Sequence, residues 1–208
     1  MELQRTANAG VLLKLDGVSI LLDGLCDRVD GYQPTPSSIA EQLLAELPDV
    51  LAFTHNHPDH CSEALLLPYR KQNLRPILGP ESLHMETVRV GEVAITPVET
   101  RHLGKAEPGL RHVSFVIQGS KCIWFTGDAA PVQWKNMTHL PRPDVLIAPY
   151  AYANTPMAWE FSRSVANNVV ILHLPEREKD PYGLWNAVQM VTAGQYVLIP
   201  EMGETVSL

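Results

Sequence analysis

The segment 54–60 holds the densest set of side chains in the chain that could do chemistry. It reads Thr54-His55-Asn56-His57-Pro58-Asp59-His60, so three imidazoles and one carboxylate fall close together. Imidazole nitrogen and carboxylate oxygen are ligands for zinc, manganese and iron at neutral pH. A pattern of four fixed positions is a more specific signal than any single histidine. The segment therefore predicts a transition-metal site.

The spacing within this segment favours two neighbouring ions. His55 and His57 are two positions apart, so on an extended chain their side chains point to the same side and can reach one ion. Pro58 disfavours a helical conformation at the residue before it. We therefore expect the chain to turn there, so that Asp59 and His60 face a second position beside the first.

Three further candidate ligands each follow a predicted strand. These are His102, Asp128 and His173. Loops at strand ends can converge, and Gly127 would let the backbone before Asp128 approach an ion closely. With the first segment this gives seven donors, which is enough for two divalent ions, with zinc expected and manganese or iron as alternatives. His112 is the only nearby rival to His102.

The elements that must position these residues are read from hydrophobic periodicity. Asp16-Gly17 joins Val11–Leu15 and Val18–Leu22 in a predicted hairpin. Further strands are predicted over 50–53, 93–98, 113–117, 122–125, 145–148, 169–172 and 196–199. Helices are predicted from a Ser37-Ser38 cap to Leu47, over 157–165, and from Leu184 to Val191 with a stop at Gly194. The pattern predicts two sheets with helices on their outer faces, in one domain over residues 1–208.

Composition excludes several classes of function. The 208 residues carry 16 Lys and Arg against 23 Asp and Glu, for a formal net charge of −7, so nucleic acid is an unfavoured partner. No apolar run is long enough to span a membrane, and the first residues do not resemble a signal peptide, so a cytoplasmic location is expected. Three scattered cysteines predict free thiols.

These motifs, in this order, resemble the metallo-β-lactamase superfamily. The resemblance rests on the segment 54–60, on His102, on Phe125-Thr126-Gly127-Asp128 and on His173. The short length and the segment 124–128 look most like the branch that contains the ascorbate-phosphate lactonase and related metal-dependent hydrolases. One departure is that Leu103-Gly104-Lys105 does not reproduce the Thr-x-Gly-His form common in the superfamily.

The resemblance implies an α/β (α+β) fold, a four-layer αββα sandwich with the metals at one edge. It implies that one ion is held by His55, His57 and His102, the other by Asp59, His60 and His173, and that Asp128 bridges them. Asp59 would also pass a proton to the leaving group. His57, where the di-iron redox branch usually has glutamate, points to hydrolysis.

The expected activity is hydrolysis of a small ester, lactone or phosphodiester by a water that the two ions activate. The positive charge left at such a centre favours an anionic or polarised small molecule as substrate. In the segment 150–156, Tyr150, Tyr152 and Asn154 are candidate substrate contacts, and a plain surface loop is the alternative. Two other functions stay open: di-iron redox chemistry on the same scaffold, and a metal-binding domain without catalysis.

Overall fold

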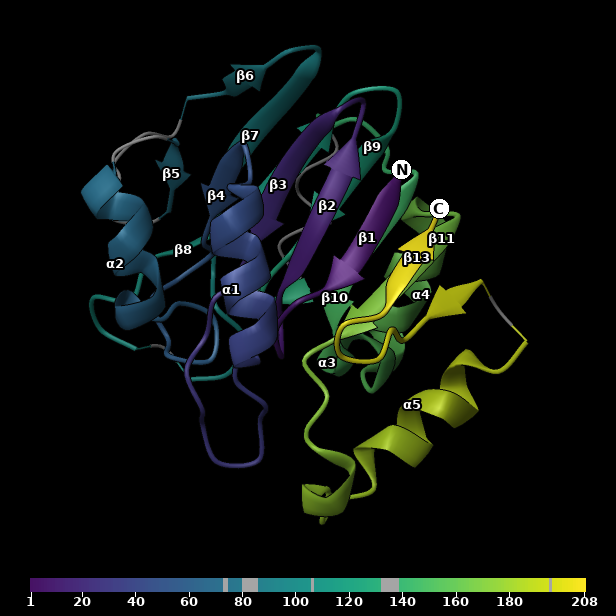
Figure 1. Ribbon diagram of the computed structural model, residues 1–208. Coiled ribbons are helices and arrows are strands. Elements are labelled where there is room, and N and C mark those ends of the chain that lie inside the picture. Colours follow the sequence, from purple (N-terminus) through teal and green to yellow (C-terminus); the bar gives the residue numbers. More distant parts are fainter. Residues whose placement is uncertain (73–74, 80–85, 106, 132–138, 195) are drawn as a thin grey trace.

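The computed structural model describes residues 1–72, 75–79, 86–105, 107–131, 139–194 and 196–208, and it contains two stacked β-sheets (Figure 1). In spatial order, the first sheet consists of β13 (Thr205–Ser207), β1 (Glu2–Arg5), β2 (Val11–Leu15), β3 (Val18–Leu22), β4 (Val50–Ala52) and β5 (Ile77–Leu78). The second consists of β12 (Val197–Leu198), β11 (Asn168–Leu172), β10 (Val145–Pro149), β9 (Cys122–Phe125), β8 (His112–Gln118), β7 (Val93–Thr100) and β6 (Val88–Val90).

The core lies between the two sheets, because strand side chains alternate between inner and outer faces. In β2, Val11, Leu13 and Leu15 belong to the inner cluster, which they share with residues of the second sheet such as Phe115. Leu12 points the other way, toward the helices. This alternation explains why the strands with a buried outer face read as continuous apolar runs.

Helices cover both outer faces. On the first sheet lie α1 (Ser37–Glu46) and α2 (Glu63–Gln72), which bury Leu43 and Leu66. On the second lie α3 (Tyr150–Ala153), α4 (Pro156–Val165) and α5 (Leu184–Thr192), and a short 3-10 turn spans Arg177–Lys179. Figure 1 shows α1 lying across the strands of the first sheet. The four-layer αββα arrangement expected from the sequence is confirmed.

Several local predictions are confirmed, and others need correction. The 11–22 hairpin forms with the expected strand bounds, and β9 also has the expected bounds. The serine cap does not form: α1 begins at Ser37 itself, after Pro36, and no side chain caps it. Elements that the sequence did not reveal are β1, β5, β6, β13 and α3.

The three cysteines form no disulfide bond with one another, in agreement with the expected thiols. Among the described residues, no helix has the length and apolar character needed to cross a membrane.

Candidate metal centre

The candidate ligands lie at one edge of the sandwich because their strands run in the same direction. In the second sheet β9, β10 and β11 are parallel, and β7 has the same direction as β9 because β8 is antiparallel to both. The loops after β7, β9 and β11 therefore meet at one edge, and they carry His102, Asp128 and His173. The loop after β4 of the first sheet brings His55 to the same place.

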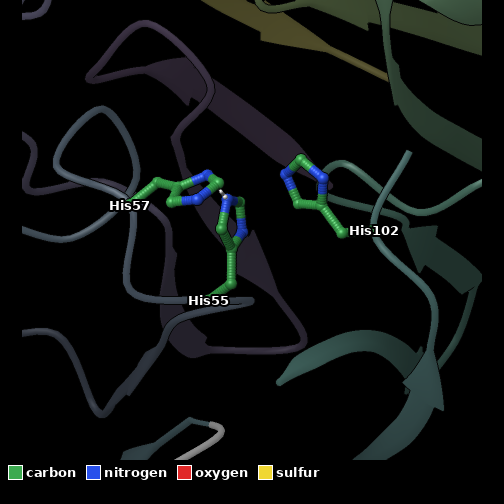
Figure 2. Close-up of side chains that lie close together, drawn as sticks. All are labelled: His55, His57 and His102. Carbon is green, nitrogen blue, oxygen red and sulfur yellow. Dashed lines mark hydrogen bonds between the residues drawn. The ribbon is translucent and has the colours of Figure 1, made fainter. Parts of the chain in front are cut away.

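Three histidines form the first ligand group, His55, His57 and His102 (Figure 2). One ring nitrogen from each lies within 4.8 Å of the others. The ring centroids are 4.6 Å apart for His55 and His57, and 4.8 Å for His55 and His102. His55 Nε2 is 3.0 Å from His57 Nδ1, a distance at which both nitrogens can turn to one ion.

The second ligand group consists of Asp59, His60 and His173, whose ligand atoms also lie within 4.8 Å of one another. His173 Nε2 is 3.1 Å from Asp59 Oδ2. His60 is fully buried. His173 has a left-handed backbone with φ of 63°, and its N–H donates to the Asn8 carbonyl. Such a φ is uncommon for residues other than glycine and is concentrated at functional sites.

Asp128 lies between the two groups. Its Oδ2 is 3.7 Å from His102 Nε2, 3.6 Å from His60 Nε2 and 3.5 Å from His173 Nε2. A third set of donors within 4.8 Å joins Asp128 to His55 and His60. The structure thus brings all seven sequence-predicted donors into one continuous cluster.

The chemistry of the cluster fits divalent cations. Within the described part of the chain, His60 Nε2, His102 Nε2, Asp128 Oδ1 and both ring nitrogens of His173 are buried without a hydrogen-bond partner. Buried polar atoms without a partner are rare, because each one costs free energy. Several of them facing one another are explained by ions that they would share.

Asp23 supports the cluster from behind, and its role was not visible in the sequence. The fully buried carboxylate follows β3, which is parallel to β4. It accepts hydrogen bonds from His60 Nδ1 at 2.8 Å and from the Thr54 N–H and hydroxyl at 2.7 and 2.6 Å. Thr54 Oγ1 in turn lies 3.0 Å from His55 Nδ1. These contacts leave Nε2 of His55 and His60 directed at the centre.

Burial and neighbouring charges set the protonation of these side chains. Burial lowers the pKa of His55, so its imidazole is neutral and able to bind a cation. Burial also opposes charge on His60 and Asp128, but their mutual attraction dominates, with Asp23 adding to it at His60. The pKa of His60 is raised well above its ordinary value. The pKa of Asp128 is held well below its ordinary value by His173 and His60.

His112, the rival to His102, lies beside the cluster and outside the three ligand groups. It is buried, its Nδ1 is 2.7 Å from Thr100 Oγ1, and its ring centroid is 5.7 Å from that of His102. Burial lowers its pKa to about 3. The backbone of His102 pairs with that of Ala129, in the loop after β9, through an isolated antiparallel β-bridge.

Gly127 is also needed for a contact within the protein. Its φ is 51°, and a Cβ at this position would lie 2.6 Å from the side chain of Thr54. The glycine therefore lets the loop before Asp128 pack against Thr54.

A cavity of about 590 Å³ opens next to the second ligand group. Tyr150 and Tyr32 both line it. The Tyr32 ring meets His173 edge-on at 4.8 Å, and the Tyr150 ring centre is 6.4 Å from that of His173. Burial, Tyr150 and the nearby carboxylates raise the pKa of the Tyr32 phenol, so it stays a hydrogen-bond donor. Tyr32 lies in the β3–α1 connection, and no motif singled it out.

The segment 150–156 is not the loop expected from the sequence, because it forms α3 and the start of α4. Tyr152 is fully buried, and its hydroxyl donates to the Ala129 carbonyl at 2.9 Å. The expectation that Tyr152 contacts substrate is therefore wrong. Asn154 is exposed at the end of α3, outside the lining of the described cavity.

Comparisons with solved structures agree with this fold. A possible metal-dependent hydrolase from Veillonella parvula is 15% identical, with a TM-score of 0.74 over 100% of this chain and 99% of that chain. An isothiocyanate hydrolase from Delia radicum gut bacteria is 19% identical, with a TM-score of 0.67 over the same shares. The di-iron β-hydroxylase CmlA from Streptomyces venezuelae is 14% identical, with a TM-score of 0.63 over 100% of this chain and 54% of that chain.

No curated protein matches the chain. None of the comparisons distinguishes the lactonase-like branch, which stays a prediction. A family model, described as the β-lactamase superfamily domain, matches residues 2–171. That match covers most of the chain and includes the segment 54–60, His102 and Asp128, so the chain belongs to the metallo-β-lactamase superfamily that its motifs resemble.

Proposed function

We propose that the chain is a metal-dependent hydrolase that binds two divalent ions and cleaves a small ester, lactone or phosphodiester. The observation that carries the proposal is the pair of three-donor groups with Asp128 between them. Zinc is the expected metal, and manganese or iron are alternatives, because all three accept imidazole and carboxylate ligands. Several of the similar structures are named metal-dependent hydrolases, which supports the reaction class.

In this proposal His55, His57 and His102 hold one ion, and Asp59, His60 and His173 hold the other. Asp128 is the shared ligand, since its Oδ2 is at similar distances from histidines of both groups. When bound, two divalent ions supply a water of lowered pKa and polarise a carbonyl or phosphoryl oxygen.

The protein's own groups handle orientation and protons. Asp23 and Thr54 fix the rings of His60 and His55 from behind. Asp59 is partly exposed, unlike His60, so its carboxylate can take a proton from water and deliver it to a leaving group. An Asp59→Asn protein that keeps both ions and full turnover would contradict this role.

The test compares His173→Gln with His139→Gln, a matched control at an exposed position outside the three ligand groups. Metal per chain is measured by elemental analysis. Turnover is measured on a panel of esters, lactones and bis(nitrophenyl) phosphate, with and without chelator. We expect two ions in the wild type and the control, and loss of one ion together with turnover in His173→Gln. Equal metal content in all three proteins would refute His173 as a ligand, and no bound metal in any of them would refute the metal centre.

Two other functions have distinct signatures. The likeness to a di-iron hydroxylase favours redox chemistry as the second candidate, although it shows the fold alone. Iron in the isolated protein, with visible absorption, would favour it over zinc hydrolysis. A metal-loaded protein that turns over nothing in the panel would favour a metal-binding domain without catalysis.

A further inference from the structure

The 590 Å³ cavity continues outward from the second ligand group. Tyr32 and Tyr150 connect the two, because they line the cavity and their rings lie beside the His173 ring. A substrate whose reacting group lies at the ions would therefore extend past these two phenols. The volume is in the range of small-molecule binding sites.

The lining of the cavity is partly aromatic and apolar and partly acidic. Besides the two phenols, it includes Tyr182, Leu184 and two prolines. Tyr182 is 85% exposed, so the face of its ring is available to a ligand. The lining also carries three carboxylates and one ammonium, those of Asp30, Glu178, Asp180 and Lys179.

Not all of these charges are available to a ligand. Asp180 accepts hydrogen bonds from two N–H groups at the start of α5, which uses its carboxylate locally. Lys179 Nζ lies 3.4 Å from Glu176, which also pairs with Arg28 at 2.8 Å. When Glu176 and Arg28 are counted with the charged lining residues, the region holds four carboxylates and two cations.

Asp30 and Glu178 are the two carboxylates that are left. Neither has an ion pair or a side-chain hydrogen bond within the described ranges of the chain. Carboxylates beside aromatic faces are the combination that binds an ammonium group, because charge attraction and the cation–π interaction act together.

Building on the proposed function, we propose that this cavity binds the non-reacting end of a substrate that carries an ammonium group on an apolar stem. The reacting carbonyl or phosphoryl group lies at the ions, the stem passes Tyr32 and Tyr150, and the ammonium group lies between Tyr182 and the carboxylates of Asp30 and Glu178. This selectivity is opposite to the preference for an anionic molecule that the charge of the ions alone would give.

The probes are hydroxamic acids, which attach to zinc at one end. Each has a polymethylene stem of one of three lengths and ends in an ammonium, methyl or carboxylate group. Dissociation constants are measured by calorimetry on the zinc-loaded protein at low salt. Exposed ion pairs are weak, so we expect the ammonium probe to bind about tenfold more tightly than the carboxylate probe at the best stem length.

The double variant Asp30→Asn with Glu178→Gln should bring this ratio close to one. The control, Glu41→Gln with Glu160→Gln, removes the same charge from exposed positions on α1 and α4 and should keep the ratio. A ratio of one or less in the wild type at every length, or a ratio unchanged in the double variant, overturns the inference alone. Failure of every probe to bind the zinc-loaded protein also overturns the inference alone, whereas a protein that takes up no zinc overturns the metal centre, and the inference with it.

Discussion

Replacing Asp23 by asparagine tests whether the buried carboxylate behind the cluster fixes His60 as a ligand. One Asp23 oxygen accepts from the Thr54 N–H, and the other accepts from the Thr54 hydroxyl and from His60 Nδ1. An amide has the same shape but presents an NH₂ group in place of one oxygen. In either orientation of the amide, at least one buried donor of Thr54 or His60 then faces another donor.

The magnitude follows from the number of bonds lost. With the amide oxygen toward the Thr54 N–H, the two hydrogen bonds at 2.6 and 2.8 Å disappear. Each buried donor left without a partner costs about 1–3 kcal/mol, so in this orientation the free energy of unfolding should fall by roughly 2–6 kcal/mol. His60 also loses the acceptor that holds its proton on Nδ1. Loss of such a partner weakens metal binding about 10- to 100-fold.

Zinc affinity is measured by competition with a chromophoric chelator, and stability by urea denaturation of the metal-free protein. Asp27→Asn is the control, because it makes the same change at an exposed neighbour that accepts one bond from the Ser62 hydroxyl. We expect wild-type affinity in the control. If Asp23→Asn binds both ions as tightly as Asp27→Asn does, the proposed role of Asp23 in orienting His60 as a ligand is refuted.

Three further predictions address other parts of the structure. Gly127→Ala places a Cβ against the side chain of Thr54 at 2.6 Å, so we expect it to lower the free energy of unfolding in urea by about 2–4 kcal/mol and to reduce bound zinc. Tyr152→Phe removes one buried hydrogen bond, so we expect it to cost about 1 kcal/mol in the same assay and to leave kcat and KM on the best panel substrate unchanged. Hydrogen bonds from Ser19 lower the pKa of Asp49 in the folded protein. The ionised carboxylate therefore stabilises the fold at pH values above about 4, the pKa of Asp in the unfolded chain. This stabilisation is lost as the pH falls through the lower pKa of the folded protein. Solvent screens this partly exposed group, so the penalty of Asp49→Asn should be below about 1 kcal/mol at neutral pH and should vanish in acid.

Each of these predictions has a contrary result. Gly109 also has a positive φ, of 86°, but nothing lies within 4 Å of its Cβ position. Equal destabilisation by Gly109→Ala and Gly127→Ala would therefore assign the effect to backbone strain, not to the contact with Thr54. A tenfold loss of kcat/KM in Tyr152→Phe with full metal content would show that Tyr152 does contribute to the substrate site. A penalty of Asp49→Asn that grows below pH 4 would contradict the direction of its pKa shift.

The parts of the fold that could be predicted from the sequence depend on local patterns. The 11–22 hairpin rests on an Asp-Gly turn between alternating residues, and the strand before the segment 54–60 on a short apolar run. The seven donors were found because their residue types are rare in combination and each follows a strand. Strand direction then brings them together, which a sequence pattern implies only once the sheet order is known.

The rest depends on contacts between distant segments. Strands β1 and β13 pair although about 200 residues separate them, and each is too short to show a pattern alone. The role of Asp23 depends on the pairing of β3 with β4, which places its carboxylate beside His60. No local pattern distinguishes it from the other aspartates. Tyr152 follows a proline and precedes another, which suggested a loop. The turn of α3 instead directs its side chain into the core.

Both ligand groups draw on both sheets, and this ties metal binding to the stability of the sandwich. His55 and His57 follow β4 of the first sheet, whereas His102 follows β7 of the second. In the other group, His60 belongs to the first sheet's loop and His173 follows β11 of the second. Each ion would therefore cross-link the two sheets at the edge of their shared core. A ligand that binds only the folded state adds about 2.7 kcal/mol at a hundred times its dissociation constant. Loss of either ion should thus loosen the packing of one sheet on the other, beginning at the edge where catalysis is proposed.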